Sequence, residues 1–286
     1  MKRIIVSFLL VVVFSTWASA ETSVWKAQKG TSIIYLGGTC HVLRETDYPL
    51  PPEFDQAYQA SEVVVFETDL GKLQDPSTQH RLLAKSMYAD GSTIDKHLSA
   101  QAYATLSDYC EANGIPLQAL LQFKPSMLMI TLTIMELMKS GVSQQGVDQF
   151  FYDLAKNDRK TVAGLETVDQ QIDFVASMAD GNEDEFVTYS IRDMKNLKQQ
   201  YGLLVEAWRT GDTVKLQEIM VSELKSRWPE LYRKLITDRN RNWLPKIEAY
   251  RKTPQREFLL VGAGHLVGPD GILAALQKKG YTIEKL

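Results

Sequence analysis

Two of the four histidines in the sequence share one local pattern. His41 and His265 each follow a glycine by three residues, in Gly38-Thr39-Cys40-His41 and Gly262-Ala263-Gly264-His265. Both patterns come at the end of an apolar run typical of a buried strand, and open α/β sheets bind ligands at the carboxyl ends of their strands. Glycine also lets the backbone turn sharply and a ligand approach closely. The two histidines are therefore the first candidates for a shared site.

A carboxylate completes this candidate set. Glu67 directly follows the apolar run Val63-Val64-Val65-Phe66, and a buried carboxylate needs a partner or a metal because an unpaired charge is costly there. Two imidazoles and one carboxylate form a familiar ligand set for a catalytic divalent metal with an open position. Such a metal polarises a carbonyl and lowers the pKa of bound water to about 7. Asp69, two residues on, is expected on the same face as a further ligand or support.

Each of these residues also has a structural interpretation, as a satisfied strand-end histidine or an ion-paired glutamate. The matching contexts at both chain ends favour the functional one. His80 and His97 lie in polar segments and are expected at the surface. Neither a helical His-Glu-x-x-His site nor a Gly-x-Ser-x-Gly elbow occurs. Cys40 is not expected to pair with His41 as a nucleophile, since neighbours on a strand point to opposite faces.

The two chain ends contain the elements that must position these residues. The pattern near the N-terminal end predicts a hairpin of residues 25–27 and 31–36 around Lys29-Gly30. A helix over 53–61 led by Pro52 and a strand over 63–66 are expected to follow. The other end predicts a strand over 257–261, a helix over 270–279 that ends at Gly280, and a strand over 281–284. Both follow the plan of strand, Gly-x-x-His, proline-led helix and strand. We expect this weak repeat to pack in one sheet and bring the histidines together.

The middle of the chain, from about 74 to 244, is almost entirely helical in pattern, with a short strand expected at 161–165. Its methionine-rich stretch from Met127 to Met138 is expected to fill a core. The predicted fold class is thus α/β: a central mixed β-sheet built from two β-α-β-type halves at the chain ends, with a large helical insert between them.

The first twenty residues have the layout of a secretory signal peptide. Lys2 and Arg3 precede an apolar run over 4–14, and Trp17-Ala18-Ser19-Ala20 supplies small residues for cleavage after Ala20. Residues 21–286 are then expected to form a single periplasmic or secreted domain without a later transmembrane segment. Removing the two basic residues from the formal net charge of −3 leaves −5, which argues against nucleic acid as a partner.

Two cysteines, Cys40 and Cys110, would meet oxidising conditions after export. Whether they form a disulfide stays open, because the sequence does not show the distance between their Cα atoms.

Taken together, these residues resemble the TraB/GumN family, which includes the Tiki proteases. The resemblance runs from about Trp25 to Leu286 and includes both Gly-x-x-His motifs and Glu67 in Val-Phe-Glu-Thr-Asp. Further matching segments are Gln145-Gly146-Val147-Asp148, Leu165-Glu166-Thr167 with Gln170-Gln171, and Arg239-Asn240 ahead of Trp243. Cys40 departs from the pattern, where we expect Ile, Ser or Trp.

The resemblance implies an erythromycin-esterase-like α/β core and metal-dependent hydrolysis of peptide bonds. His41, His265 and Glu67 would be the metal ligands and catalytic groups, with manganese, cobalt or zinc as the divalent metal. Arg239 would bind a substrate carboxylate or stabilise an oxyanion. Asp148, Glu166 and Asn240 match further family positions, and for the first two a salt bridge or helix cap is an equal alternative.

The sequence thus predicts an exported metal-dependent hydrolase that acts on a peptide or small-molecule substrate. One alternative is a non-catalytic periplasmic binding protein for a peptide signal or a haem-like ligand, with a histidine as axial ligand. Ester hydrolysis is a third possibility, suggested only by analogy of fold. Substrate, metal and oligomeric state are not determined by the sequence.

Overall fold

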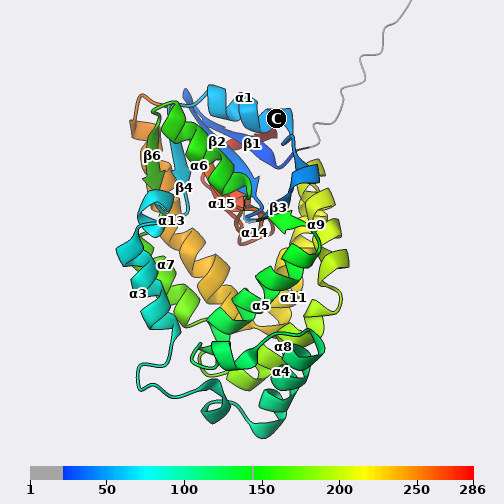
Figure 1. The fold of residues 1–286 in the computed structure, drawn as a ribbon. Coiled ribbons are helices and arrows are strands. Elements are labelled where there is room, and N and C mark those ends of the chain that lie inside the picture. The colour runs from blue at the N-terminus through cyan, green and yellow to red at the C-terminus, as the bar shows by residue number, and fades with distance from the viewer. Residues whose placement is uncertain (1–21, 144) are drawn as a thin grey trace, which may run out of the picture.

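The computed structural model describes residues 22–143 and 145–286, so the expected signal segment lies outside the described residues. Figure 1 shows the strands gathered at one end of the molecule and most helices extending from them. The main sheet contains β1 (Val24–Lys29), β2 (Ser32–Thr39), β4 (Val63–Phe66), β6 (Thr161–Gly164), β7 (Glu257–Gly262) and β8 (Thr282–Lys285). A separate small sheet pairs β3 (Leu43–Arg44) with β5 (Val142–Ser143).

The main sheet is mixed and joins both ends of the chain. Its strand order is β6-β4-β7-β2-β1-β8. The neighbours β6, β4, β7 and β2 run parallel, whereas β1 pairs antiparallel with both β2 and β8. The expected hairpin is confirmed, with Gly30 at a φ of +64° in its turn. The predicted α/β class and the strands near 161–165 and 257–261 are confirmed as well.

Helices cover the sheet and explain why its central strands are buried on both faces. In the core, Phe151 from α6 (Val147–Asn157) lies 5.6 Å from Phe258 of β7, ring centre to ring centre, and α1 (Pro52–Gln59) contributes Phe54 to the same aromatic cluster. Proline occupies the first turn of α1, as predicted. The C-terminal helix α15 (Ile272–Lys278) buries Ile272 and Leu276, and a short helix, α14 (Ala263–Leu266), follows β7 directly.

A largely helical region separates β4 from β7, as the sequence predicts. Its further helices are α2 (Leu70–Leu73), α3 (Pro76–Ser86), η2 (Ile94–Lys96), α4 (Ala100–Ala112), η3 (Leu117–Leu120), α5 (Pro125–Lys139), α7 (Val168–Ala176), α8 (Glu183–Met194), α9 (Leu197–Thr210), α10 (Thr213–Gln217), η4 (Glu218–Ser222), α11 (Glu223–Arg227), α12 (Pro229–Tyr232), η5 (Arg233–Thr237), α13 (Asp238–Ala249) and η6 (Tyr250–Lys252). Short helix η1 (Glu45–Asp47) precedes α1. No helix among the described residues is long and apolar enough to cross a membrane.

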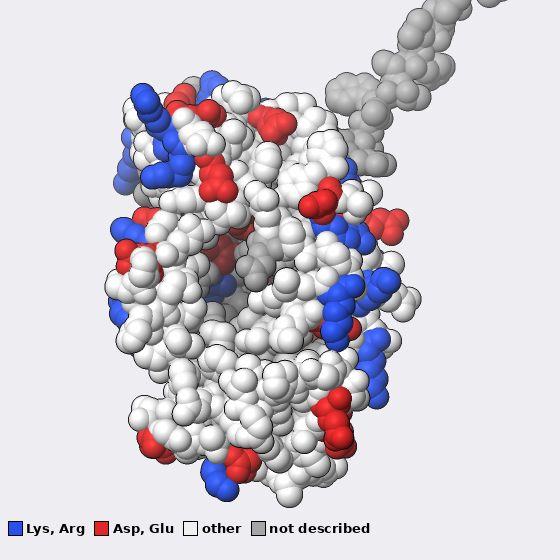
Figure 2. All heavy atoms as spheres, in the orientation of Figure 1, with Lys and Arg blue, Asp and Glu red and all other residues white. Residues whose placement is uncertain are grey.

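The helical region has a hydrophobic core of its own, separate from that of the sheet. Met129 is buried in it and Met135 packs against it, as expected for core methionines, whereas Met138 is 55% exposed. Cys110 belongs to this core and Cys40 to the core of the sheet, and both thiols are free. Between the two parts, Figure 2 shows the surface deeply hollowed, with acidic and basic side chains inside the hollow.

Candidate active site

Four adjacent parallel strands deliver polar side chains to one edge of the sheet. His41 follows β2, Glu67 follows β4, Glu166 follows β6, and Gly262 ends β7 just before His265 in α14. Because parallel strands present their carboxyl ends at the same edge, residues far apart in sequence meet here. The structure thus brings together the two histidines and the glutamate that the sequence singled out.

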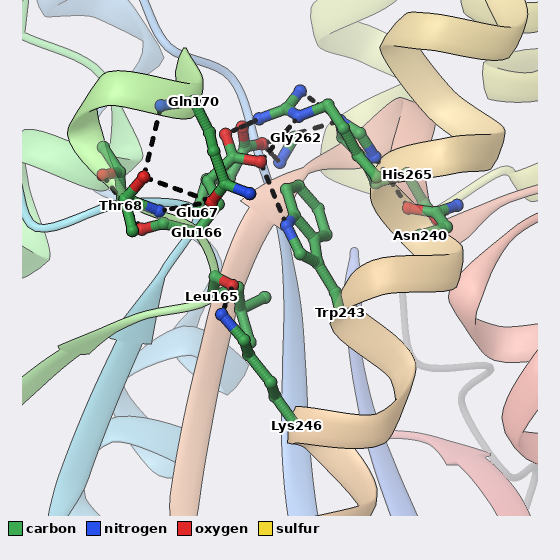
Figure 3. Close-up of polar contacts among 12 residues, drawn as sticks. Glu67, Thr68, Leu165, Glu166, Gln170, Asn240, Trp243, Lys246, Gly262 and His265 are labelled. Carbon is green, nitrogen blue, oxygen red and sulfur yellow. Dashed lines mark hydrogen bonds and ion pairs between the residues drawn. The ribbon is translucent and has the colours of Figure 1, made fainter.

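His265 is buried and its ring is oriented by Asn240. The amide nitrogen of Asn240 donates to the carbonyls of His265 and Asp270, at 3.1 and 3.0 Å, so its oxygen faces the ring at 2.8 Å from Nδ1. Nδ1 therefore carries the proton and donates it to Asn240, which leaves Nε2 as an acceptor. Nε2 lies 3.0 Å from Nη1 of Arg239. Figure 3 shows His265 and Asn240 facing each other beside the glutamates.

His41 is oriented by a carboxylate instead. Its Nδ1 lies 2.8 Å from Oδ2 of Asp148, whose Oδ1 accepts a hydrogen bond from Thr39. The side chain is 64% exposed and lines a cavity of about 300 Å³. Gly146 makes this arrangement possible, since a Cβ there would lie 2.2 Å from the carbonyl carbon of His41. α6, which carries Asp148, can thus approach the turn after β2.

Glu67 lies beside His265 and is held at both oxygens. Oε1 accepts a hydrogen bond from the backbone N–H of Gly262 at 2.8 Å, and Oε2 accepts one from Nη2 of Arg239 at 2.6 Å. A Cβ on Gly262 would lie 3.2 Å from Oε1 of Glu67 and 3.5 Å from Nε2 of His41. Glycine at the end of β7 therefore keeps open the space between the carboxylate and the rings. Gly38 lets β2 pass equally close to Ala263.

Helix α13 supplies the remaining groups from one face. Arg239 forms a two-point ion pair with Glu166, at 2.6 and 3.1 Å, and lies 4.6 Å from the ring centre of Trp243. Trp243 also donates its indole N–H to Glu166 at 3.1 Å. Our sequence analysis used Trp243 only as a landmark, although spacings of three and four residues from Asn240 and Arg239 place all three on one helix face. The π-helical turn η5 directly precedes them, a distortion frequent at functional sites.

The three central groups have different charges near neutral pH. Attraction to Asp148 raises the pKa of His41 to about 9, against the effect of burial. Burial, with the positive charge of Arg239, lowers the pKa of His265 to about 3 despite Glu67. Burial would raise the pKa of Glu67, but interactions with His265, Arg239 and His41 and the hydrogen bond from the Gly262 N–H outweigh burial and lower the pKa to about 2. The centre therefore combines a protonated His41, a neutral His265 and an ionised Glu67.

The centre contains side chains of the types that ligate divalent metals, but they are not arranged around one point. Both histidines have their Nδ1 atoms engaged, and such outer partners fix the tautomer that presents Nε2 to a metal. The Glu67 carboxylate lies 3.9 Å from Nε2 of His265, and Arg239 donates to both groups in this structure. In residues 22–143 and 145–286, no three His, Cys, Asp or Glu side chains converge closely enough to hold an ion. A metal would therefore require the Arg239 guanidinium to withdraw from Nε2 of His265.

The structure does not bring Asp69 into this group. Its carboxylate accepts a hydrogen bond from the backbone N–H of Lys72 and caps α2. Because β4 ends at Phe66 and a helix begins at Leu70, the alternation of a strand does not extend to this position. Asp69 instead lines a separate polar cavity of about 920 Å³ on the outer side of Glu166. His80 and His97 are exposed, as predicted.

Comparison with known proteins assigns the chain to a family. The model of the TraB/PrgY/gumN family matches residues 23–285, nearly the whole chain, so the protein belongs to that family. No curated protein and no solved structure gives a significant match.

Proposed function

With membership of this family as the premise, we propose that the protein is an exported, metal-dependent hydrolase of peptide bonds. His41, His265 and Glu67 would hold a divalent metal, with manganese, cobalt or zinc as the candidates. Export is part of the proposal and rests on the basic, apolar and small-residue segments that precede Glu21.

One observation carries the proposal. Two histidines from neighbouring parallel strands have their Nδ1 atoms engaged by Asp148 and Asn240, and the buried Glu67 carboxylate lies 3.9 Å from Nε2 of His265. Metal-binding histidines characteristically donate their other N–H to a carboxylate, carbonyl or amide oxygen. A structural pair of histidines would not need a glycine that leaves the space beside both rings empty.

The residues around this centre have complementary tasks in hydrolysis. A bound divalent metal would polarise the substrate carbonyl and lower the pKa of water. Glu67, which is ionised and buried, would either ligate this metal or act as the base that accepts the proton of the attacking water. Arg239 is held by two hydrogen bonds to Glu166, so once it withdraws from Nε2 of His265 its Nη1 could donate to the oxygen that gains negative charge, or to a substrate carboxylate.

Elemental analysis of the purified protein tests the metal assignment. We expect about one divalent ion per chain in the wild type, and loss of that ion in His41→Ala and His265→Ala, since each removes one of three protein ligands. His80→Ala is a matched control, because it removes an exposed histidine of α3. Full metal uptake by both site variants would contradict the assignment.

Mass spectrometry of a peptide mixture incubated with the protein tests the reaction. Glu67→Gln should lower the cleavage rate by roughly 10²- to 10⁴-fold, the range typical for loss of a general base. Peptides that are bound by wild type but recovered intact would favour the alternative of a binding protein without turnover.

A further inference from the structure

An apolar cavity opens directly beside the candidate centre. It has a volume of about 300 Å³, and His41 and Gly262 lie on its edge. The remaining wall comes mainly from the turn after β2, from α9 and from the π-helical turn η4. It includes Cys40, Val42, Leu137, Tyr201, Leu204 and Met220.

Away from His41, the walls of this cavity offer almost nothing to a charged group. No Asp, Glu, Lys or Arg lines it. Tyr201 directs its hydroxyl elsewhere, toward the carbonyl of Val42 at 3.2 Å and the carboxylate of Asp47 at 3.3 Å. The Cys40 side chain is buried and behaves as a small apolar group with a weak S–H donor. A charged ligand group held away from His41 would lose its hydration here without compensation.

The position of the cavity relates it to the reacting bond. A Cβ on Gly262 would lie 3.5 Å from Nε2 of His41 and 3.2 Å from Oε1 of Glu67, so the cavity edge is within one side-chain length of the centre. A group held in the cavity would therefore belong to a residue that flanks the cleaved bond.

We infer that this cavity is a specificity subsite that receives one bulky, uncharged aliphatic or aromatic side chain of the substrate, next to the bond that is hydrolysed. The inference rests on the proposed function for the identity of the substrate as a peptide. The volume of the cavity agrees with this assignment, because an engineered apolar cavity of about 150 Å³ is already large enough for benzene. Leu204 and Met220 approach from different elements and would set the length of side chain that fits.

Binding measurements separate this inference from the proposed reaction. Blocked peptides that differ at one residue, with Leu, Phe, Ala or Glu there, are titrated calorimetrically into full-length mature Glu67→Gln protein, whose turnover is suppressed. We expect the Leu and Phe peptides to bind roughly ten- to hundredfold more tightly than the Ala and Glu peptides, the gain from burying one large apolar side chain.

Two variants on α9 form a matched pair for this test. Leu204→Trp, added to Glu67→Gln, should fill the cavity and remove the preference for Leu and Phe. Leu203→Trp should preserve it, because Leu203 is 42% exposed and does not line the cavity. If Leu204→Trp fails to fold, as judged by circular dichroism, Met220→Phe narrows the same cavity from η4 and should lower affinity for the Phe peptide more than for the Leu peptide.

The outcomes are distinct. Equal affinities for the Leu and Glu peptides, equal effects of Leu204→Trp and Leu203→Trp, or no binding of any peptide would overturn the subsite. A preserved preference for Leu and Phe, with no cleavage of any peptide by the wild type, would support the subsite and contradict the proposed hydrolysis.

Discussion

The two Gly-x-x-His segments end neighbouring strands of one sheet, yet they place their histidines in opposite environments. The side chain of His41 is largely exposed, has a carboxylate at Nδ1 and has a raised pKa. His265 is buried, has an amide at Nδ1 and a lowered pKa. The strand and its glycine determine where each ring lies, whereas the partner at Nδ1 and the access of water determine its charge.

This difference assigns the two histidines unequal structural roles. The ring of His265 belongs to a buried network with Asn240, Arg239 and two glutamates, so changes there should affect the fold. The Asp148–His41 pair borders water, so changes there should affect chemistry more than stability. Three substitutions test this asymmetry.

The largest effect is expected from Arg239→Met. The substitution preserves much of the side-chain volume but leaves Glu67 and Glu166 as buried carboxylates without their shared partner. Breaking a buried ion pair from one side costs about 3–5 kcal/mol. Urea unfolding at neutral pH measures the change in the free energy of unfolding. A decrease below about 1 kcal/mol, the size typical of exposed ion pairs, would show that the region around His265 is not the rigid one.

A smaller effect is expected from Asn240→Asp, which gives His265 the kind of partner that His41 has. The new carboxylate can still accept from Nδ1, but it loses the amide donor and faces the carbonyls of His265 and Asp270. We expect a loss of about 1–3 kcal/mol, the cost of buried polar groups without partners. Unfolding curves that coincide with those of wild type would contradict this account of the ring's orientation.

The smallest effect on stability is expected from Asp148→Asn, which should nevertheless clearly change the titration of His41. By NMR of the metal-free protein, the His41 midpoint should fall from about 9 toward its ordinary value of 6.5. Because the pKa in the folded state is the higher one, the pair stabilises the fold fully below pH 6.5 and loses this contribution as pH rises through about 9. The substitution should therefore weaken the fold slightly at pH 6 and not at pH 10. An unchanged His41 midpoint would show that Asp148 is not the cause of the raised pKa.

Local patterns predicted the framework of the site. Gly-x-x-His after an apolar strand, and Glu67 after another, could be recognised because the end of a strand is encoded by adjacent residues. The similar plan of the two chain ends predicted that they share one sheet, but not the order of its strands. Asp69 shows the limit of this reasoning, since the strand ended sooner than its alternation implied.

The contacts that give the site its charges were not visible in local patterns. Asp148, Glu166, Arg239 and Asn240 were selected by family resemblance, and which ring each one contacts depends on how α6 and α13 pack on the sheet. The apolar cavity escaped prediction for a related reason. Leu204 and Met220 occur in helical segments where a residue that lines a cavity has the same pattern as one that fills a core.

The place of β7 in the sheet has a consequence for the order in which the protein is made. This strand is the penultimate one in the sequence, yet it lies between β4 and β2 and pairs with both. Until residues 257–262 leave the ribosome, Glu67 has no Gly262 N–H to bind and the strands that carry the two sides of the site are not neighbours. An incomplete chain therefore has no assembled centre, and the candidate chemistry is withheld until synthesis is almost finished.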